Sequence, residues 1–557
     1  MSEQLLTLLT GVLSKNACIS TEPEVLAMYL QGTEGLENFQ EKKRNIFALI
    51  KVSKQTDVKA VLTLANELSA NSELRFTLYP VSTGKNWGYG TSQPAEIGEH
   101  IILLDLSLLN NISYFDEELG LVTLEPGVTQ QQLSNFLIEN DYPYMVPVTG
   151  AGPDCSILAN ALERGYGITP YTDHFSAVNS IQGYWADGSC FQSAVNTLDQ
   201  STEQVVDKTY KWGLGPYLDG LFTQSSFGVV TQMTIRLAKI KPAFTSFFIQ
   251  LADDELMEQA IPLIRKTLQD YEGIVGSINL MDQRRVLSMF AKNPNGNEQH
   301  KVMSDSDVKQ LAKQQQTPSW TIVGSIYGSK SVVKAVKTEI NNLFKQIPCK
   351  RIYSTSPVLV VVNKFINALP KWLVKRVAIL TMIAQQMDSF DKGKAIMLGR
   401  PNKVALKLAY WRNPESEQLD PEELSPSNDN CGLLWYAPLI TMKASIMRDY
   451  VNFIRTTCPK YNIEPFITFT NLKHDCVDST IPIVFDLTNP KAVEDAHNCL
   501  KELVTEGLKK GFVPYRLNID QQQWLLDKEQ PFWQTVNKLK QVLDPNAVLS
   551  LGRYNPK

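Results

Sequence analysis

The sequence predicts an α+β protein, with a glycine-rich first domain, a second α+β domain and a short C-terminal segment. Helix-type and strand-type spacings of apolar residues alternate along the chain, without the regular repeat of a doubly wound sheet. Glycines gather in three blocks between residues 79 and 237, and these clusters end at the Lys-Ile-Lys-Pro stretch 239–242. A chain of 557 residues holds roughly two to four domains at about 100–200 residues each.

The first domain is expected over residues 41–240, after a segment 1–40 that the three-and-four spacing of its apolar residues predicts to be helical. The elements predicted inside this domain, in order, are a strand at 47–53, a helix at 56–70, strands at 75–82 and 100–109, a hairpin at 111–128, a helix at 129–140 and a closing strand at 228–237.

The second domain is expected over residues 241–510. A strand and helix (246–268), followed by a strand (318–328) and a helix (331–347), predict a β-α-β-α sandwich that covers another part of the protein. The apolar run Val358–Val362 predicts a buried strand, and the acidic stretch 413–430 predicts a surface loop. Residues 370–388 combine basic residues with an apolar face. We expect that helix to pack on a core or a partner subunit, with contact to a membrane surface as the less favoured alternative.

Composition and charge exclude several classes of protein. The chain is 43% hydrophobic and 20% charged, and 54 Lys+Arg against 58 Asp+Glu give a net charge of −4. No basic surface for nucleic acid is therefore expected. The N-terminus lacks the basic start of a secretory signal, and the eight cysteines are scattered without a CxxC pair, which predicts a cytoplasmic protein. The five histidines show no HxH or HExxH grouping, so we expect no metal site.

The three glycine blocks together predict a bound dinucleotide. The first, residues 79–90, follows a strand and has glycines at 84, 88 and 90 that can expose backbone N–H groups to a pyrophosphate. It matches neither a Walker A loop nor the GxGxxG motif. In the second, residues 148–174, glycines at 150, 152, 165 and 167 flank a short helix. The third, residues 211–232, has glycines at 213, 215, 220 and 228 before a strand.

The motifs in these blocks resemble those of the vanillyl-alcohol oxidase / para-cresol methylhydroxylase flavoproteins. The similar segments are PVSTGKNWGYG, LEPGVT, ANALERGYGITPYTDHF, WGLGPYLDGLFTQSSFGVVT, PYR at 514–516 and DPNAVLSLGRY. Their order and spacing are closest to the phenol-oxidising branch, and the resemblance is weakest between about residues 243 and 430.

The resemblance implies FAD in a two-subdomain PCMH-type domain, a cap domain over the flavin ring, and a C-terminal segment, 511–557, that returns to the FAD domain. It also implies hydride transfer from a para-substituted phenol or a related aromatic alcohol to the flavin. The acceptor would then be O2 or an electron-carrier protein, and the enzyme would be a homodimer.

Carried over by motif, Tyr89, Tyr515 and Arg516 correspond to the family's residues that grip the phenolate oxygen. The chemistry agrees, because a buried phenolate requires hydrogen-bond donors and a nearby cation. Arg553 corresponds to the basic residue near the flavin N1–C2=O region. The residues implied to contact FAD are Pro80, Ser82, Gly84, Lys85, Asn86, Gly88, Gly150, Gly152, Pro153, Asp154, Ser156, Asn160, Glu163, Gly165, Tyr166, Gly228, Val229 and Arg553.

Two departures from the family pattern affect the expected chemistry. Ala151 stands where the family's oxidases have an aspartate near flavin N5, which leaves the acid–base group unassigned, with Asp154 as a candidate, and favours a dehydrogenase over an oxidase. The strand at 433–438 has no histidine for a covalent flavin bond, and residue 86 is asparagine. We therefore expect noncovalent FAD, with a tyrosyl link as the alternative.

Two histidines and two cysteines are candidates for structural or active-site roles. His174 is expected to play a structural part, whereas His474 is a weaker candidate for the active site. Cys155 and Cys431 are expected to be buried thiols close to the flavin ring.

Two alternative functions remain. One is oxidation of a larger aromatic or heteroaromatic biosynthetic intermediate, which the missing aspartate and histidine and the divergent cap favour. The other is a flavin electron-transfer subunit of a complex, which only the amphipathic stretch 372–387 favours.

Overall fold

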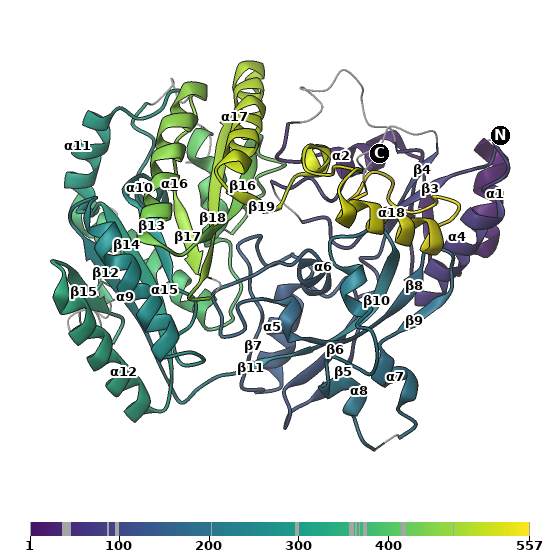
Figure 1. Ribbon diagram of the computed structural model, residues 1–557, viewed down its shortest axis with the longest axis horizontal. Coiled ribbons are helices and arrows are strands. Elements are labelled where there is room, and N and C mark those ends of the chain that lie inside the picture. The colour runs from purple at the N-terminus through teal and green to yellow at the C-terminus, as the bar shows by residue number, and fades with distance from the viewer. Residues whose placement is uncertain are drawn as a thin grey trace.

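A computed structural model describes residues 2–35, 46–85, 88–94, 100–201, 203–295, 300–355, 361, 365–366, 368–370, 376–413, 419–420, 422–471 and 473–555. The chain forms two α+β halves that lie side by side (Figure 1). One half contains the first 240 residues and the last part of the chain, and the other contains one large antiparallel sheet.

The first half begins with a four-stranded sheet in the order β1-β2-β4-β3. Its elements are β1 (Cys18–Ser20), β2 (Ala48–Lys51), β3 (Thr77–Val81), β4 (Ile101–Asp105) and the helix α4 (Gln55–Glu67). Strands β2 and β3 run parallel to β4 because α4 carries the chain back between β2 and β3. Helix α1 (Ser2–Val12) packs its Leu5 and Leu9 into the same core as Val58 and Val61 of α4.

The wholly helical N-terminal segment expected from the sequence is wrong in one part. Between α1 and α2 (Pro23–Leu30), residues 18–20 form β1, which pairs antiparallel with β2. The apolar spacing in 1–40 did not distinguish a three-residue edge strand from a helix, since such a strand is too short for its period of two to appear. Residues 36–40 lie outside the described residues.

The second sheet of this half has the order β5-β6-β10-β8-β9 and is antiparallel throughout. Its strands are β5 (Ile112–Asp116), β6 (Leu121–Leu124), β8 (Val178–Trp185), β9 (Cys190–Gln192) and β10 (Gly228–Arg236). The expected hairpin is β5–β6, and the helices α5 (Gln130–Glu139) and α6 (Ile157–Leu162) share its core. Short elements complete this half of the molecule: β7 (Tyr144–Met145), α7 (Ala194–Leu198), α8 (Val206–Thr209) and β11 (Ala238–Lys239). Strands β7 and β11 pair with each other as a separate two-stranded sheet.

The other half is an eight-stranded antiparallel sheet in the order β15-β12-β14-β13-β17-β18-β16-β19. The strands are β12 (Ala243–Leu251), β13 (Asn279–Asp282), β14 (Trp320–Gly328), β15 (Lys350–Tyr353), β16 (Cys431–Thr441), β17 (Thr468–Asn471), β18 (Cys476–Asp486) and β19 (Val513–Arg516). The predicted strand, helix, strand and helix are β12, α9 (Leu256–Asp270), β14 and α12 (Lys330–Leu343), with β13, α10 (Gln283–Phe290) and α11 (Asp305–Gln315) inserted between them.

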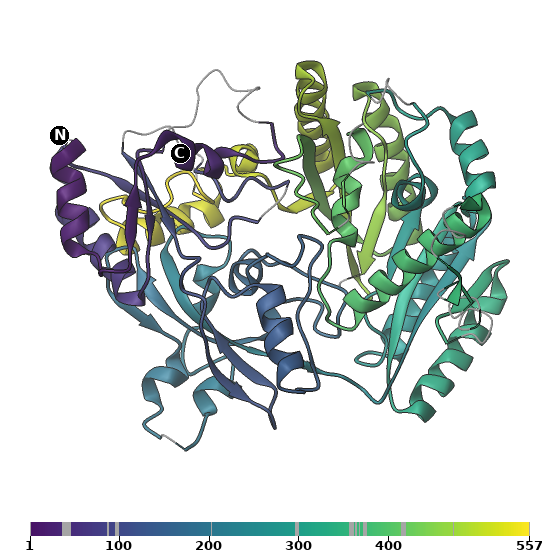
Figure 2. The same cartoon turned by 180° about the vertical axis from the view of Figure 1, so that it is seen from behind.

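Residues alternate between the two faces of this sheet. In β12, Phe247, Ile249 and Leu251 belong to a core that also contains residues of α9, α12, α16 (Ala444–Thr457) and α17 (Pro490–Lys509). The other face carries α15 (Ala378–Met397), which lies in front of the large sheet in Figure 2. The centroid of the Phe390 ring in α15 lies 5.0 Å from that of Phe248 in β12. This alternation is what turns polar side chains of the same strands toward the first half of the molecule.

The C-terminal segment joins both halves. Its first part, β19, is the edge strand of the large sheet, so the segment does not return directly to the first half. The next elements of the segment are a 3-10 helix (Ile519–Trp524) and the helix α18 (Pro531–Leu543). The chain then runs beside β3, where Leu78 N–H donates to Val548 O at 2.8 Å. Figure 1 shows α18, in yellow, among the N-terminal strands.

The other expectations for the second domain fall partly outside the described residues. Of the run Val358–Val362, only Val361 is described; it is 64% exposed and is not in a strand, contrary to the expected buried strand. Residues 371–375 and 414–418 also lie outside. Within the parts of the chain that are described, no helix has both the length and the apolar character needed to cross a bilayer.

Candidate active site

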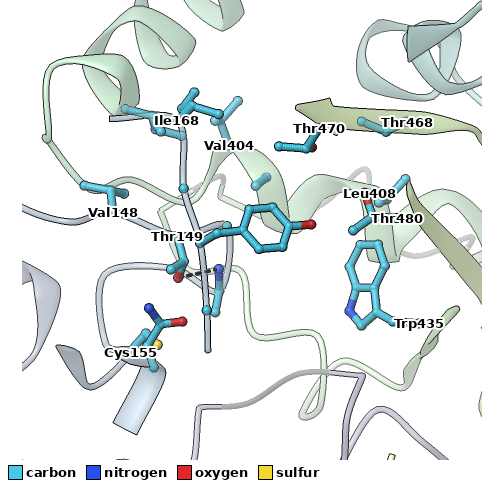
Figure 3. Close-up of a pocket in the computed structure, with 18 of the residues that line it drawn as sticks. Val148, Thr149, Cys155, Ile168, Val404, Leu408, Trp435, Thr468, Thr470 and Thr480 are labelled. Carbon is cyan, nitrogen blue, oxygen red and sulfur yellow. Dashed lines mark hydrogen bonds between the residues drawn. The ribbon is translucent and has the colours of Figure 1, made fainter. Parts of the chain in front are cut away.

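A cavity of about 1050 Å³ lies between the two halves. It is lined by loops of the first half, by one face of the large sheet, by α15 and by the C-terminal segment. Figure 3 shows its central part, where Val148, Thr149 and Ile168 of the first half lie opposite Trp435, Thr468 and Thr480 of the sheet.

The loop after β3 forms one wall of the cavity, through Pro80, Ser82, Gly84 and Lys85. Gly84 has φ +67°, and the nearest atom to a Cβ placed there would be 4.0 Å away. Glycine is therefore required here by backbone conformation, and the space beside it is open to a ligand. Asn86 lies outside the described residues.

Gly88 has a different function from the one expected, because it does not line the cavity. Its N–H donates to Thr33 Oγ1 (2.9 Å) and Glu34 Oε1 (3.1 Å), and a Cβ would lie 2.4 Å from Trp435 Cδ1. Gly90 N–H also donates to Glu34 Oε1, at 2.9 Å. The glycine at 88 thus allows the chain to pass close to Trp435 and hold Tyr89 in position.

The second glycine block contributes α6 and the loop before it. Ser156 caps α6, accepting from Ala159 N–H at 3.1 Å, and donates to Pro126 O at 2.6 Å. The predicted residues of this block that line the cavity are Gly150, Ser156, Asn160, Glu163, Gly165 and Tyr166.

Three predicted residues of this block do not reach the cavity: Gly152, Pro153 and Asp154. Asp154 is exposed at a turn, three residues before the start of α6. Ala151 does line the cavity, so the position expected to hold an acid faces the ligand space without one.

His174 plays the structural part expected. Its Nδ1 lies 2.6 Å from Asn160 Nδ2, its side chain is buried, and burial lowers its pKa to about 4. A neutral imidazole therefore fixes Asn160, over which Gly165 passes so closely that a Cβ would overlap Asn160 Oδ1.

From the third block, the second half contributes: Phe222, Ser225 and the start of β10, which includes the predicted Gly228 and Val229, line the cavity. A Cβ on Gly228 would lie 2.5 Å from Tyr184 O. Gly213, Gly215 and Gly220 lie elsewhere. The glycine pattern therefore overstated how much of this block faces a ligand.

Tyr89, Tyr515 and Arg516, which come from distant parts of the sequence, meet in the cavity. The Arg516 guanidinium carbon lies 4.2 Å from the centroid of the Tyr89 ring, and the Tyr89 and Tyr515 hydroxyls interact with each other. Burial raises the pKa of both tyrosines, which keeps their hydroxyls protonated as donors. We call these three residues the clamp.

The guanidinium groups of Arg516 and Arg553 lie beside the carboxylate of Glu163, so these three groups together carry a net charge of +1 when all are ionised. Glu163 is buried and forms ion pairs with Arg553 and, at 3.5 Å, with Arg516 Nε. The positive charge of Arg516 opposes the effect of burial on the pKa of Tyr89. Two guanidinium groups that share one carboxylate can stabilise an anion in the adjacent space.

A buried carboxyl beside the clamp was missed from the sequence. Asp478 of β18 is fully buried, accepts a hydrogen bond from the Tyr166 hydroxyl, and lies close enough that a negative charge on it would raise the pKa of both Tyr89 and Tyr515. Burial raises the pKa of Asp478 well above its usual range. The alternation of β18 puts Asp478 on the same face as Thr480, but only the strand register shows which face that is.

Trp435 of β16 was also missed, and it lines the cavity (Figure 3). His474, by contrast, lies in the turn between β17 and β18 and does not line the cavity. Cys155 lines it as expected, whereas Cys431 is buried in a separate cluster with Leu406 and Tyr410.

The cavity fits an FAD. The open cradle at Gly84, the end of α6, the start of β10, and Ser550 and Arg553 of the C-terminal segment form one continuous lining. All five histidines are among the described residues, and none of them lines it. Tyr436, on the strand expected to carry a covalent link, is buried on the opposite face, beside Tyr450. Among the described residues, no group of three or more His, Cys, Asp or Glu could hold a metal ion.

Comparisons with known proteins identify the domain and the fold. Residues 47–193 match the family model described as an FAD binding domain. Two curated relatives cover most of the chain. The 1'-carboxy-chondrochloren decarboxylase of Chondromyces crocatus is 27% identical over 91% of this chain and 90% of its own length. The 4-cresol dehydrogenase [hydroxylating] flavoprotein subunit of Pseudomonas putida is 24% identical over 86% and 84%.

Solved structures share the fold over the whole length. A substrate-bound p-cresol methylhydroxylase aligns over 100% of this chain and 97% of its own, with a TM-score of 0.83 and 21% identity. The 4-ethylphenol oxidase of Gulosibacter chungangensis aligns over the same shares, with a TM-score of 0.83 and 18% identity. The α+β architecture, the FAD cofactor and the family resemblance expected from the sequence are confirmed: the chain is an FAD-dependent oxidoreductase with the fold of the PCMH-type flavoproteins.

Proposed function

We propose that this enzyme removes a hydride from the benzylic carbon of a para-substituted phenol, or of a related aromatic alcohol, that is bound as its phenolate by the clamp. The observation that carries the proposal is the meeting of two buried tyrosine hydroxyls and one buried guanidinium in a single cavity.

Each clamp residue has a separate task. The Arg516 guanidinium lowers the pKa of a phenol bound beside it, because it stabilises the ionised form. Tyr89 and Tyr515 remain protonated and donate hydrogen bonds to the phenolate oxygen. An ionised phenol releases a benzylic hydride readily, since the quinone methide left behind is neutral and conjugated. Bound FAD supplies the acceptor for that hydride.

The relatives support this choice of substrate class. Their names refer to 4-cresol, p-cresol and 4-ethylphenol, which are all phenols with a para-alkyl group. Their identities to this chain are 24%, 21% and 18%. The clamp geometry, rather than the names, therefore carries the argument.

The test is steady-state oxidation of 4-ethylphenol by the wild type and by the Tyr515→Phe and Arg516→Ala variants. Loss of a charge-assisted hydrogen bond in the transition state lowers kcat/KM by roughly 10- to 100-fold, and we expect the larger effect for Arg516→Ala. Tyr171→Phe, at a half-exposed tyrosine outside the cavity, is the matched control. Full activity in both clamp variants would remove the phenolate clamp from the mechanism.

A second candidate is oxidation of a larger aromatic or heteroaromatic biosynthetic intermediate. It is supported by the extension of the cavity along the large sheet, away from the residues expected to hold FAD, and by the likeness to a decarboxylase whose name describes a carboxylated substrate. Anaerobic mixing distinguishes the two candidates. If simple phenols leave the flavin absorbance unchanged while a bulky phenol bleaches it, the larger substrate is correct.

The acceptor and the assembly belong to the same proposal. We infer a cytoplasmic homodimer that passes electrons to O2 or to an electron-carrier protein. An oxygen electrode and a soluble electron-acceptor dye separate the two acceptors, and sedimentation measures the assembly. If the protein is reduced only when a second protein is added, it acts as an electron-transfer subunit instead.

A further inference from the structure

The sheet side of the cavity is formed by two rows of side chains that cross the strands. In the first row, register pairs join neighbouring strands from β18 to β15 in the order Thr480, Thr468, Met281, Thr321, Gln250 and Lys350. The second row runs beside it in the order Thr470, Asn279, Val323, Phe248 and Ile352. Every residue of both rows lines the cavity, so we call them together the cap rows.

The cap rows are much longer than a simple alkylphenol needs. Neighbouring strands lie about 4.7–4.9 Å apart, so the five steps from Thr480 to Lys350 span about 24 Å. The Thr480 end is near the clamp, since Arg516 pairs with Ala437 of β16, the strand next to β18. Lys350, at the other end, is exposed. The cavity therefore runs from the clamp across the sheet to the edge of the molecule.

Polar atoms of the cap rows are directed into the cavity without protein partners. Thr321 Oγ1, Thr468 Oγ1 and Asn279 Oδ1 are buried, and none has a hydrogen-bond partner among the described residues. Thr321 is 6% and Thr468 8% exposed. A buried polar group without a partner is costly, whereas valine would fit the same strand positions. The rows are therefore suited to a ligand that carries polar groups along its length.

A cation also faces the cavity beside these rows. Arg285 lies in the first turn of α10, directly after β13, and its side chain lines the cavity. Its Nη1 lies 3.3 Å from Ser288 Oγ, and it forms no ion pair within 4.0 Å with any carboxylate in the described part of the chain. The nearby Asp282 carboxylate accepts from the N–H groups of Arg284, Arg285 and Ile467.

The adjacent arginine shows what a paired guanidinium looks like in this helix. Arg284 forms ion pairs at 3.0 Å with Asp305 and Glu464, away from the cavity. Burial lowers the pKa of Arg285 to about 10, so the group remains charged at neutral pH. Arg285 is partly buried and its charge is opposed at longer range by that of Asp282, so an anionic ligand in the cavity would give the guanidinium a direct ion-pair partner.

We propose that the substrate is an elongated 4-substituted phenol whose tail lies along the cap rows and carries a carboxylate bound by Arg285. This inference rests on the proposed function, because it takes the ring of that substrate to be at the clamp. Strand β13 is two places from β18, which separates the carboxylate from Thr480 by about 10 Å across the sheet. The guanidinium can bind both carboxylate oxygens in its planar fork.

The test compares binding of 4-hydroxyphenylalkanoates, with chains of two to eight carbons, to that of their methyl esters. For phenols that reduce the flavin, apparent dissociation constants come from the dependence of the anaerobic flavin-reduction rate on ligand concentration. For ligands that do not reduce it, they come from the change in flavin absorbance on titration of the FAD-loaded enzyme. We expect the acid to bind more tightly than the ester only for the longer chains. Arg285→Gln should raise the dissociation constant of the long acid by roughly 10- to 100-fold and change that of 4-ethylphenol by less than twofold.

Two further variants control this test. Arg265→Gln alters an arginine that donates to Met442 O at 3.0 Å outside the cavity, and we expect it to change neither constant. Arg285→Lys keeps the charge and should recover part of the affinity. Should Arg285→Gln fail to fold, the wild-type chain-length series decides, because the preference for the acid must appear at long and not at short chains.

The outcomes separate this inference from the proposed function. Equal affinity of the wild type for acid and ester at every chain length overturns the carboxylate site, even when phenols are oxidised. The non-oxidisable probe 8-phenyloctanoate tests the opposite case. If its binding depends on Arg285 while no phenol is oxidised, the carboxylate site stands and the phenol chemistry is wrong.

Discussion

Asp478 shows how a single residue can serve the site by being uncharged. It is buried beside Tyr166, close enough for its charge to act on both clamp tyrosines, and it has no cation as a partner among the described residues. Burial raises its pKa, so the proton stays on the carboxyl in the folded protein. A neutral Asp478 leaves the positive charge of Arg516 available to the phenolate.

The substitution Asp478→Asn should therefore change how stability depends on pH. The folded pKa lies above the unfolded one, so the folded protein binds more protons, and the stability due to this group falls as pH rises through the folded pKa. Asparagine does not titrate and can still accept from Tyr166. We expect the free energy of urea unfolding of the variant to exceed that of the wild type increasingly from pH 5 to pH 8. Asp475→Asn, in the exposed turn before β18, is the control, and parallel curves for all three proteins would contradict the prediction.

At the scale of elements, the segment after α2 links the loop that contains Tyr89 to the large sheet and to α17. Glu34 Oε1 accepts from the N–H groups of Gly88 and Gly90, on either side of Tyr89, and Glu34 O lies 2.7 Å from His497 Nε2 of α17. Thr33 O accepts from Leu433 N–H of β16 at 2.7 Å. Two consecutive residues thus fix the position of Tyr89 relative to the large sheet.

Removing that carboxylate should weaken catalysis without touching the clamp itself. Glu34→Ala leaves Gly90 N–H without its acceptor and Gly88 N–H with Thr33 Oγ1 alone, which costs about 1–3 kcal/mol of folding stability. Because Tyr89 lies between those groups, we expect kcat/KM for 4-ethylphenol to fall about tenfold, equivalent to about 1.4 kcal/mol of transition-state binding. Glu34→Gln keeps an acceptor oxygen and should lose less. Glu22→Ala, at an exposed glutamate directly before α2, is the control, and an unchanged kcat/KM in Glu34→Ala would show that Tyr89 needs no such support.

At the scale of the whole molecule, the sequence predicted what local patterns determine. The strand before Gly84, the capped helix after Ser156 and the β5–β6 hairpin follow from periodicity and turn residues. The resemblance brought Tyr89, Tyr515 and Arg516 together. Asp478, Trp435, Arg285 and the cap rows were not foreseen, because their faces depend on the register of strands far apart in the sequence, and a shift by one residue would reverse them. Gly88 and Asp154 were misplaced for a different reason, because a motif gives the residue types of a loop and not the direction in which the loop turns.

The assembly of the cavity from distant segments predicts how the cofactor is retained. Its FAD side combines the loop after β3, α6, the start of β10 and the C-terminal segment, and no histidine lines it. These contacts exist only in the folded chain, so denaturation should remove all of them at once. We expect acid precipitation of the purified yellow enzyme to leave the FAD absorbance in the supernatant and a colourless pellet.

A flavin that stays with the pellet would contradict this prediction and indicate a covalent bond. Tyr436 is not positioned to be the anchor in that case, because its side chain is on the face of β16 away from the cavity. Tyr166 lines the cavity and would then be the tyrosine to replace with phenylalanine. Release of the flavin by Tyr166→Phe, with retention by Tyr436→Phe, would assign the link. Noncovalent binding predicts instead that added FAD raises the melting temperature of the apoprotein in a concentration-dependent way, since a ligand that binds only the folded state stabilises it by mass action.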